Sequence, residues 1–154
     1  MNAAQVQTEA SEETKQMSEP NDWNAKMIEE FRAHEGRVGG HLEGAPLLLL
    51  NSIGARSGKE RVSPLMYQAV GDAYAVFASK GGAPSHPDWY HNLVATPDTT
   101  IEVGTRTVPV RARIADGVER DSIWETQKQR YPGFADYEAS TTRQIPVVIL
   151  EPVG

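Results

Sequence analysis

The sequence contains no cysteine. A chain without thiols forms neither a disulfide framework nor a thiolate metal site, so any catalysis has to use other groups. Long apolar runs are also missing, because the longest, Leu47–Leu50, is far shorter than the roughly 20 residues of a membrane-spanning helix. Residues 1–17 lack the basic start and apolar stretch of a secretory signal, and we therefore expect a cytoplasmic protein.

An excess of positive charge is missing as well. The chain has 15 Lys and Arg residues against 21 Asp and Glu residues, which gives a formal net charge of -6. Affinity for nucleic acid comes mostly from a net basic surface, so a general nucleic-acid binder is not expected. A local basic patch is compatible with this charge.

The first twenty residues are polar and poor in large apolar side chains. We expect residues 1–20 to be a disordered tail and residues 21–154 to form one domain, since a chain of this length suits a single core. Asn21 or Asp22 is predicted to cap a helix that ends near Gly36 and carries Trp23, Met27, Ile28 and Phe31 on one face. Packing of this helix on the domain is favoured over contact of the N-terminal segment with a membrane.

Short runs of strand-forming residues follow this helix. The predicted strands are Leu47–Ile53, Val62–Val70, Tyr74–Ser79, Thr99–Val103, Arg106–Ile114 and Pro146–Leu150. Tight turns at residues 71–72 and 104–105 predict antiparallel hairpins. About six strands without regular alternation of strand and helix indicate a protein that is mainly β with helices (α+β), built on a small, mostly antiparallel barrel.

Two helices are predicted between the strands. One covers Asp88–Ala95 and begins after Pro87. The other starts at a capping box of Asp116 and Glu119 and runs toward Tyr131, before a proline.

The connection Gly54–Arg61 combines two glycines, a serine and three cations, Arg56, Lys59 and Arg61. Glycines let backbone N–H groups approach an anion, and Arg and Lys supply charge-assisted hydrogen bonds. This loop is therefore a candidate anion site, and a solvated basic turn is the alternative. It is not an ATP-binding P-loop, because the spacing differs and a strand follows.

The segment Ala78–Pro84 repeats this chemistry at a strand end, with a serine, a lysine and two glycines. A second anion contact there would let one extended ligand be held at two points. A plain strand-end turn explains the glycines equally well.

Aromatic residues mark two further segments. His86–Asn92 places two histidines five positions apart, on different sides of a helix, which argues against a metal site. Trp89 and Tyr90 are candidates for the core or for a wall against a flat ring. Tyr131, Phe134 and Tyr137 recur every three residues beside Pro and Gly, which fits either core packing or a lid over a flat ligand.

Three of these segments together match a known series of motifs. They are Gly54-x-Arg56-Ser57-Gly58-x-x-Arg61-x-x-Pro64-Leu65, Ala78-Ser79-Lys80-Gly81-Gly82-x-Pro84 and His86-Pro87-x-Trp89-Tyr90-His91-Asn92-Leu93. In order and spacing the sequence resembles the deazaflavin-dependent nitroreductase family, over about residues 44–152. Taken together, the motifs are very specific.

This resemblance implies a split β-barrel of the FMN-binding-like type that uses coenzyme F420, an 8-hydroxy-5-deazaflavin with a phosphodiester and an oligoglutamate tail, as hydride donor. It assigns the anionic part to Arg56, Ser57, Lys59, Arg61 and Lys80, and it assigns the ring to Pro64, Leu65, Met66, Ser79 and the segment Trp89–Asn92. The implied coenzyme-binding residues are Gly54, Arg56, Ser57, Gly58, Lys59, Arg61, Val62, Ser63, Pro64, Leu65, Met66, Ala78, Ser79, Lys80, Gly81, Pro87, Trp89, Tyr90, His91 and Asn92.

For the acceptor, the resemblance implies a small molecule covered by the C-terminal aromatic segment. Ser79, Tyr137 and Tyr131 are the catalytic candidates, and Tyr67 and Phe134 are the pocket candidates. Phe134 stands where a nitroimidazole-activating member of the family has tyrosine, so a quinone is favoured over a nitro compound. No metal is required for hydride transfer.

Two other classes stay open on the sequence alone. A related split barrel that binds FMN or haem would use the same cations for a shorter phosphate or for propionates. A non-catalytic carrier of the deazaflavin or of a lipid-like ligand would have the same basic loops without an acceptor pocket.

Overall fold

The computed structural model describes residues 20–38 and 45–153, with side chains from residue 24 onward in the first segment. Of the predicted tail, residues 1–20, all but Pro20 lie outside this part, as does the predicted position of the Trp23 side chain. The first helix, α1, covers Pro20–Ala33. Asn21 and Asp22 lie inside it, so the prediction that either residue caps it is wrong.

Six strands form one closed antiparallel barrel in the order β1-β2-β3-β6-β5-β4. They are β1 (Leu47–Ile53), β2 (Glu60–Val70), β3 (Ala73–Phe77), β4 (Asp98–Val103), β5 (Arg106–Ile114) and β6 (Val147–Pro152). The barrel closes where β4 pairs with β1, with Leu50 opposite Ile101. The α+β barrel expected from the sequence is confirmed.

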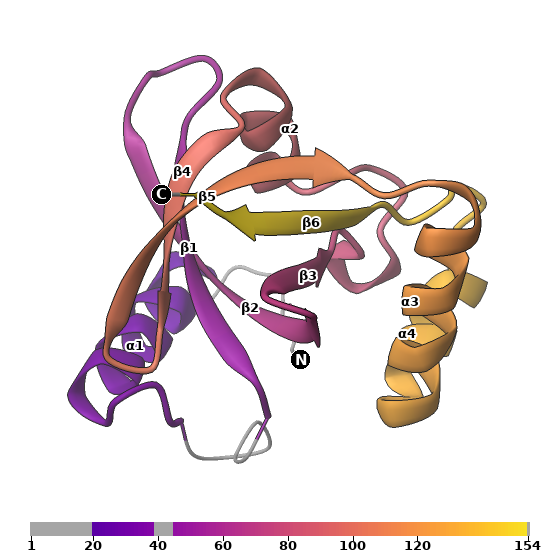
Figure 1. Cartoon of the computed structure of the whole chain (residues 1–154), viewed down its shortest axis with the longest axis horizontal. Coiled ribbons are helices and arrows are strands. Elements are labelled where there is room, and N and C mark those ends of the chain that lie inside the picture. The colour runs from indigo at the N-terminus through magenta and orange to yellow at the C-terminus, as the bar shows by residue number, and fades with distance from the viewer. Residues whose placement is uncertain (1–19, 39–44, 154) are drawn as a thin grey trace.

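Three helices follow in the later part of the chain: α2 (Asp88–Ala95), α3 (Gly117–Arg130) and α4 (Gly133–Ala139). Figure 1 shows α1 on one side of the barrel, the α3–α4 pair on the other side, and α2 near the β1–β2 connection. In the described part of the chain, no helix is long and apolar enough to cross a membrane.

Strand alternation sorts the apolar side chains into three cores. The barrel core combines inward residues of the strands, such as Leu48 and Val148, with Trp89 and Leu93 of α2. The outer faces of β3 and β6 pack against α3 through a second core that contains Phe77 and Trp124. The third core holds α1 against the outer faces of β1 and β2.

The predicted capping box of α3 does not form. Asp116 occupies the N-cap position, but its side chain makes no capping hydrogen bond. Glu119 instead accepts two hydrogen bonds from Arg113 on β5, at 2.7 and 2.8 Å. Glu151 of β6 accepts a third from the same guanidinium. A bidentate pair with a charged donor is stronger than a reciprocal cap to backbone N–H groups, so the tertiary contact prevails.

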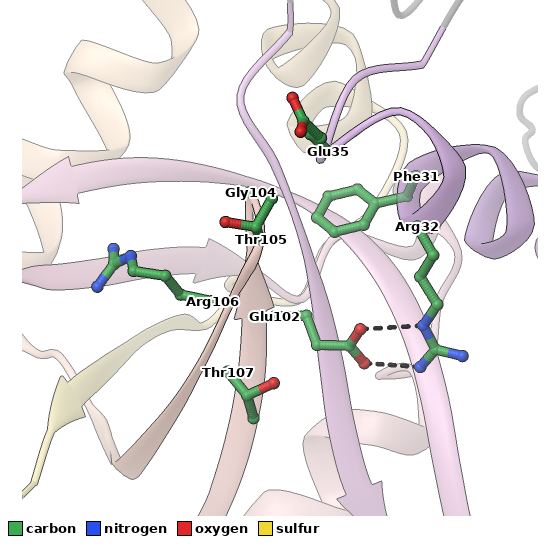
Figure 2. A pocket seen from close by; sticks show the side chains of 8 residues that line it. All are labelled: Phe31, Arg32, Glu35, Glu102, Gly104, Thr105, Arg106 and Thr107. Carbon is green, nitrogen blue, oxygen red and sulfur yellow. Dashed lines mark hydrogen bonds and ion pairs between the residues drawn. The ribbon is translucent and has the colours of Figure 1, made fainter.

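A two-fold hydrogen-bonded ion pair docks α1 on the barrel. Arg32 donates from Nε and Nη2 to the two oxygens of Glu102 on β4, at 2.9 and 2.6 Å (Figure 2). Just beyond α1, Gly36 has a φ of +94°, and a Cβ there would lie 2.8 Å from the Cα of Gly104. Only glycine permits this close approach to the β4–β5 turn.

A pocket of about 210 Å³ opens at this junction. Figure 2 shows the side chains that line it, which come from the end of α1 and from the β4–β5 hairpin: Phe31, Arg32, Glu35, Glu102, Gly104, Thr105, Arg106 and Thr107. None of the site residues predicted from the sequence lines it.

The Arg32–Glu102 pair predicts a pH-dependent contribution to stability. Hydrogen bonding to Arg32 lowers the pKa of Glu102. The contribution is therefore complete above the ordinary carboxyl range and is lost as the pH falls through the lower pKa of the folded state. Glu102→Gln should cost about 0.5–1 kcal/mol of unfolding free energy at pH 7, because Arg32 is half exposed, and less at pH 3. Urea titrations at both pH values measure this, with Glu29→Gln on exposed α1 surface as the control. An equal loss at both pH values would contradict the assignment.

Candidate active site

The basic loop, Gly54–Arg61, is shaped by its own backbone and by one buried side chain. The Gly54 N–H donates to the Lys59 carbonyl at 2.8 Å, and the Gly58 N–H donates to the Gly54 carbonyl at 2.9 Å. The Asn92 amide oxygen, on α2, accepts from the Ala55 N–H at 2.9 Å. Asn92 also donates to the Ser52 hydroxyl at 3.2 Å, so its buried amide supports the loop from behind.

The three cations of the basic loop lack a hydrogen-bond or ion-pair partner in the described part of the chain. Arg56, Lys59 and Arg61 are exposed, and none of their side chains makes a hydrogen bond or ion pair with another described residue. Several arginines elsewhere are paired, as Arg32 is with Glu102 and Arg111 with Asp98. In a chain of net charge -6, three unpaired cations on one connection indicate a surface suited to a polyanion.

The second glycine-containing segment forms a turn rather than the end of a strand. β3 stops at Phe77 instead of the predicted Ser79, because Lys80, Gly81 and Gly82 have φ values of +49°, +63° and +84°. The Gly82 N–H donates to the Ser79 carbonyl at 2.9 Å, and the Ala83 N–H donates to the Lys80 carbonyl at 3.1 Å. We call Ser79–Ala83 the Ser79 turn.

The Ser79 turn presents three successive backbone donors. The N–H groups of Ser79, Lys80 and Gly81 have no acceptor among the described residues. Ser79 is right-handed in its backbone and Lys80 is left-handed, which is the combination that forms an anion-binding nest of converging N–H groups. The Lys80 ammonium, 3.3 Å from the Ser85 hydroxyl, adds a charge beside them.

Helix α4 packs directly on this turn. A Cβ at Gly82 would lie 2.9 Å from both the Tyr137 carbonyl oxygen and the Ser140 Cβ. The structure thus places the backbone of Tyr137, a predicted catalytic residue, against Gly82 of the turn that begins at Ser79, another predicted catalytic residue. Burial, and then the charge of Asp136, raise the pKa of the Tyr137 phenol, so it stays protonated at neutral pH and is able to donate a proton.

The other aromatic candidates are divided. Phe134 is half-buried between Phe77, Trp124 and Tyr137, with ring centroids 5.6, 6.1 and 5.3 Å away. Core packing therefore accounts for part of the predicted aromatic stripe. Tyr131 is half-buried at the end of α3 and makes no ring contact with the others in the described residues.

Tyr67, a predicted pocket residue, points into the barrel. Its ring packs into the barrel core and meets Tyr74 edge to face at 5.3 Å. Phe134 and Tyr137 pack on the outer face of β3 instead. The family resemblance, which placed Tyr67 in the same pocket, does not specify the face of β2 on which it lies, and that placement stays a prediction.

The same alternation divides the predicted ring-binding residues of β2. Val62 and Met66 point outward toward α1, whereas Leu65 points into the barrel. By strand alternation Pro64 shares the outward face and Ser63 the inward face. From α2, Trp89 is buried in the barrel core and His91 is exposed.

Arg143, which the sequence interpretation did not select, is the most connected polar side chain near the Ser79 turn. It donates to the carbonyls of Ala83, Ala78 and Ser79 at 2.9, 3.2 and 2.9 Å. Its Nη1 also lies 2.9 Å from His86 Nδ1. The sequence signal was the polar run 140–143, but its partners lie 57–65 positions earlier in the chain.

His86 is therefore engaged as a hydrogen-bond acceptor. Burial, and then the charges of Arg143 and His91, lower its pKa, so the imidazole is neutral at pH 7. Within residues 20–38 and 45–153, no group of three or more His, Asp or Glu side chains is placed to hold a metal ion.

A closed antiparallel barrel that presents a nest of N–H groups and a basic loop defines a class of protein suited to an anionic ligand. Comparison with known proteins identifies the family. The model of the F420H(2)-dependent quinone reductase family matches residues 23–152, and the chain belongs to this family of oxidoreductases.

Relatives and solved structures agree with this membership. An F420H(2)-dependent quinone reductase of Mycobacterium tuberculosis is 40% identical over 124 residues, which cover 78% of this chain and 83% of the relative. The solved structure of an F420-H2 dependent reductase, FDR-A, is 41% identical, with a TM-score of 0.64 over 73% of this chain and 100% of that one. A structure described as a domain-swapped dimer is 38% identical, with a TM-score of 0.66 over 86% and 99% of the two chains. The resemblance stated from the motifs is confirmed.

Proposed function

We propose that this protein binds reduced F420 with its anionic arm on the Ser79 turn and the basic loop, and reduces a quinone. The observation that carries the proposal is the set of three successive free N–H groups beside Lys80. When bound, the reduced coenzyme supplies a hydride in a two-electron step. Family membership and the M. tuberculosis relative's name support a quinone as acceptor.

The residues present fit a coenzyme with a phosphodiester and several carboxylates. The nest N–H groups and Lys80 would hold one anionic group, and Arg56, Lys59 and Arg61 would hold others along the basic loop. Charge-assisted hydrogen bonds of this kind are worth about 1.5–3 kcal/mol each. Asn92 then acts on the coenzyme indirectly, by fixing the loop.

The acceptor side is formed by residues that face α4. By the family resemblance the flat ring would lie near Pro64 and Ser79, whereas Val62 and Met66 pack on α1. The Ser79 and Tyr137 hydroxyls would face the acceptor. A hydroxyl that donates to the acceptor oxygen as charge develops contributes about 10²–10⁴ in rate. Tyr137 is suited to this because its phenol is protonated at neutral pH. Tyr131 is the next candidate donor.

A spectroscopic assay tests the proposal directly. Reduced F420 is mixed with the protein and menadione under nitrogen, and the return of oxidised F420 absorbance is followed. We expect turnover with F420 and none with reduced FMN, and an F420 dissociation constant in the micromolar range or below, since about -8 kcal/mol is within reach of several such hydrogen bonds. If F420 binds but no quinone is reduced, the protein is a non-catalytic carrier of the coenzyme. Equal or tighter binding of FMN would overturn the coenzyme assignment.

Nitro compounds are the second acceptor class within this proposal, and Phe134 is the residue that would discriminate between quinones and nitro compounds. Phe134→Tyr adds a hydroxyl to a half-buried ring next to Tyr137. If this hydroxyl donates to a nitro group chiefly in the transition state, turnover of a bicyclic nitroimidazole should rise about tenfold, since one such bond is worth about 1.4 kcal/mol.

Steady-state rates with menadione and with the nitroimidazole, for both variants, measure this effect. Coenzyme affinity should not change, because the substitution lies on the α4 side. A wild-type protein that already reduces the nitroimidazole as fast as menadione would show that Phe134 does not discriminate.

A further inference from the structure

The guanidinium of Arg143 lies behind the Ser79 turn, on the carbonyl side of its peptide groups. Four of its five N–H donors are used: one each for the carbonyls of Ala83, Ala78 and Ser79, and one toward His86 Nδ1. No carboxylate pairs with it among the described residues. This half-buried guanidinium therefore uses three of its hydrogen bonds to hold backbone carbonyls.

The carbonyls that Arg143 holds belong to the peptide groups of the nest. The Ala78 carbonyl and the Ser79 N–H share one planar peptide group, and the Ser79 carbonyl and the Lys80 N–H share the next. Because the two ends of a trans peptide point in opposite directions, fixing both carbonyls on Arg143 directs both N–H groups away from it. The third nest donor, the Gly81 N–H, is fixed in the same way, since the Lys80 carbonyl accepts from Ala83.

Arg143 also acts through charge. Burial lowers its pKa, but a guanidinium remains protonated in proteins, and the neutral His86 imidazole does not cancel the charge. A hydrogen bond from a cation to a carbonyl polarises the whole peptide group, which strengthens the N–H at its other end by roughly 10–30%. The nest therefore gains both orientation and donor strength from one side chain.

We propose that Arg143 is the positioning residue that orients and polarises the nest N–H groups of Ser79 and Lys80 for an anionic group of the ligand. This inference rests on the proposed function, because it assigns the anionic arm to the Ser79 turn. Arg143 lies in the segment between α4 and β6. One residue therefore connects the part of the chain that follows α4 with the turn proposed to hold the anion.

The wild-type protein provides the first test, with inorganic phosphate as the probe. In a titration followed by two-dimensional ¹H–¹⁵N NMR, the amide signals of Ser79, Lys80 and Gly81 should shift most. If phosphate binds and these three amide signals do not shift, the proposal is wrong. This test uses the wild-type protein, so it does not depend on the folding of a variant.

Three matched variants provide the second test. Arg143→Met should raise the dissociation constants for phosphate and F420 about 10- to 100-fold. Lys80→Met removes the neighbouring charge and leaves Arg143 in place. Arg111→Met removes an exposed arginine on β5, paired with Asp98, and should leave both constants unchanged. Circular dichroism confirms that each variant is folded at the temperature of the titration.

The pattern of outcomes separates this inference from the proposed function. If Lys80→Met weakens binding and Arg143→Met does not, the positioning role is wrong and the site stands. If neither does, the assignment of the anion to this turn is wrong. A positioning role also predicts that Arg143→Met raises the KM for reduced F420 at least tenfold while kcat at saturating coenzyme changes less than about threefold. A fall in kcat at unchanged KM would refute it.

Discussion

Replacing Arg56 and Lys80 together with alanine should weaken F420 binding by about 10²–10⁴-fold, since each removes a charge-assisted contact worth about 1.5–3 kcal/mol. Arg56 is an unpaired cation on the basic loop, and Lys80 stands beside the free N–H groups of the nest. Each single substitution should cost about 10- to 100-fold. Fluorescence titration of the coenzyme measures the effect, and its dependence on salt concentration should become weaker in the double variant.

Stability should hardly change in this variant, because neither side chain packs in a core. Arg130→Ala, at an exposed cation of α3, is a suitable control for the loss of charge alone. Normal F420 affinity in the double variant would reject an arm held at two points. A loss of F420 affinity equal to that caused by Arg130→Ala would show that the effect comes from net charge and not from contacts at these two positions.

Gly82→Ala should lower the free energy of unfolding by about 2–4 kcal/mol, because backbone strain and overpacking act at the same position. The φ of Gly82 is +84°, and a Cβ would lie 2.9 Å from Tyr137 and Ser140 of the α4 region. The new methyl group has to push α4 off the Ser79 turn, so coenzyme affinity and quinone turnover should fall together. Urea unfolding followed by tryptophan fluorescence reports the stability.

The neighbouring glycine is a matched control. Gly81 has a φ of +63°, but a Cβ there would meet nothing within 4 Å. Gly81→Ala should therefore cost only about 1 kcal/mol, from strain alone. Equal losses in the two variants would show that contact with α4 is unimportant at Gly82.

Elements bounded by clear turn chemistry were predictable from the sequence. The bounds of β1, α2 and β5 agree with the prediction, because a Gly, Pro or Asp residue lies within two positions of each end. The end of β3 was not predictable, since Ser79 continues the strand pattern and only the left-handed backbone of Lys80 stops it. The capping box of Asp116 failed because Arg113, at the end of the preceding strand, takes both oxygens of Glu119.

For the site, local motifs identified the segments but not the direction of their side chains. The basic loop and the Ser79 turn stand out because glycines and cations occur together within a few residues. The inward direction of Tyr67 was not predictable, because the face of a strand on which a residue lies depends on the register of that strand in the barrel. Arg143 was missed because its partners are backbone carbonyls, which carry no residue-type signal at all.

The position of β6 has a consequence for the order in which the protein is made. β6 follows every other strand in the chain, yet it lies between β3 and β5 in the barrel (Figure 1). During translation, β3 and β5 therefore keep unpaired edges until Val147–Pro152 leaves the ribosome, and such edges favour pairing with other chains. Arg143 emerges just before β6, so the nest acquires its support only as the barrel closes. A nascent chain from which β6 has not yet emerged has neither a finished sheet nor the contacts of Arg143 with the nest, so the proposed anion site would form only as the barrel closes.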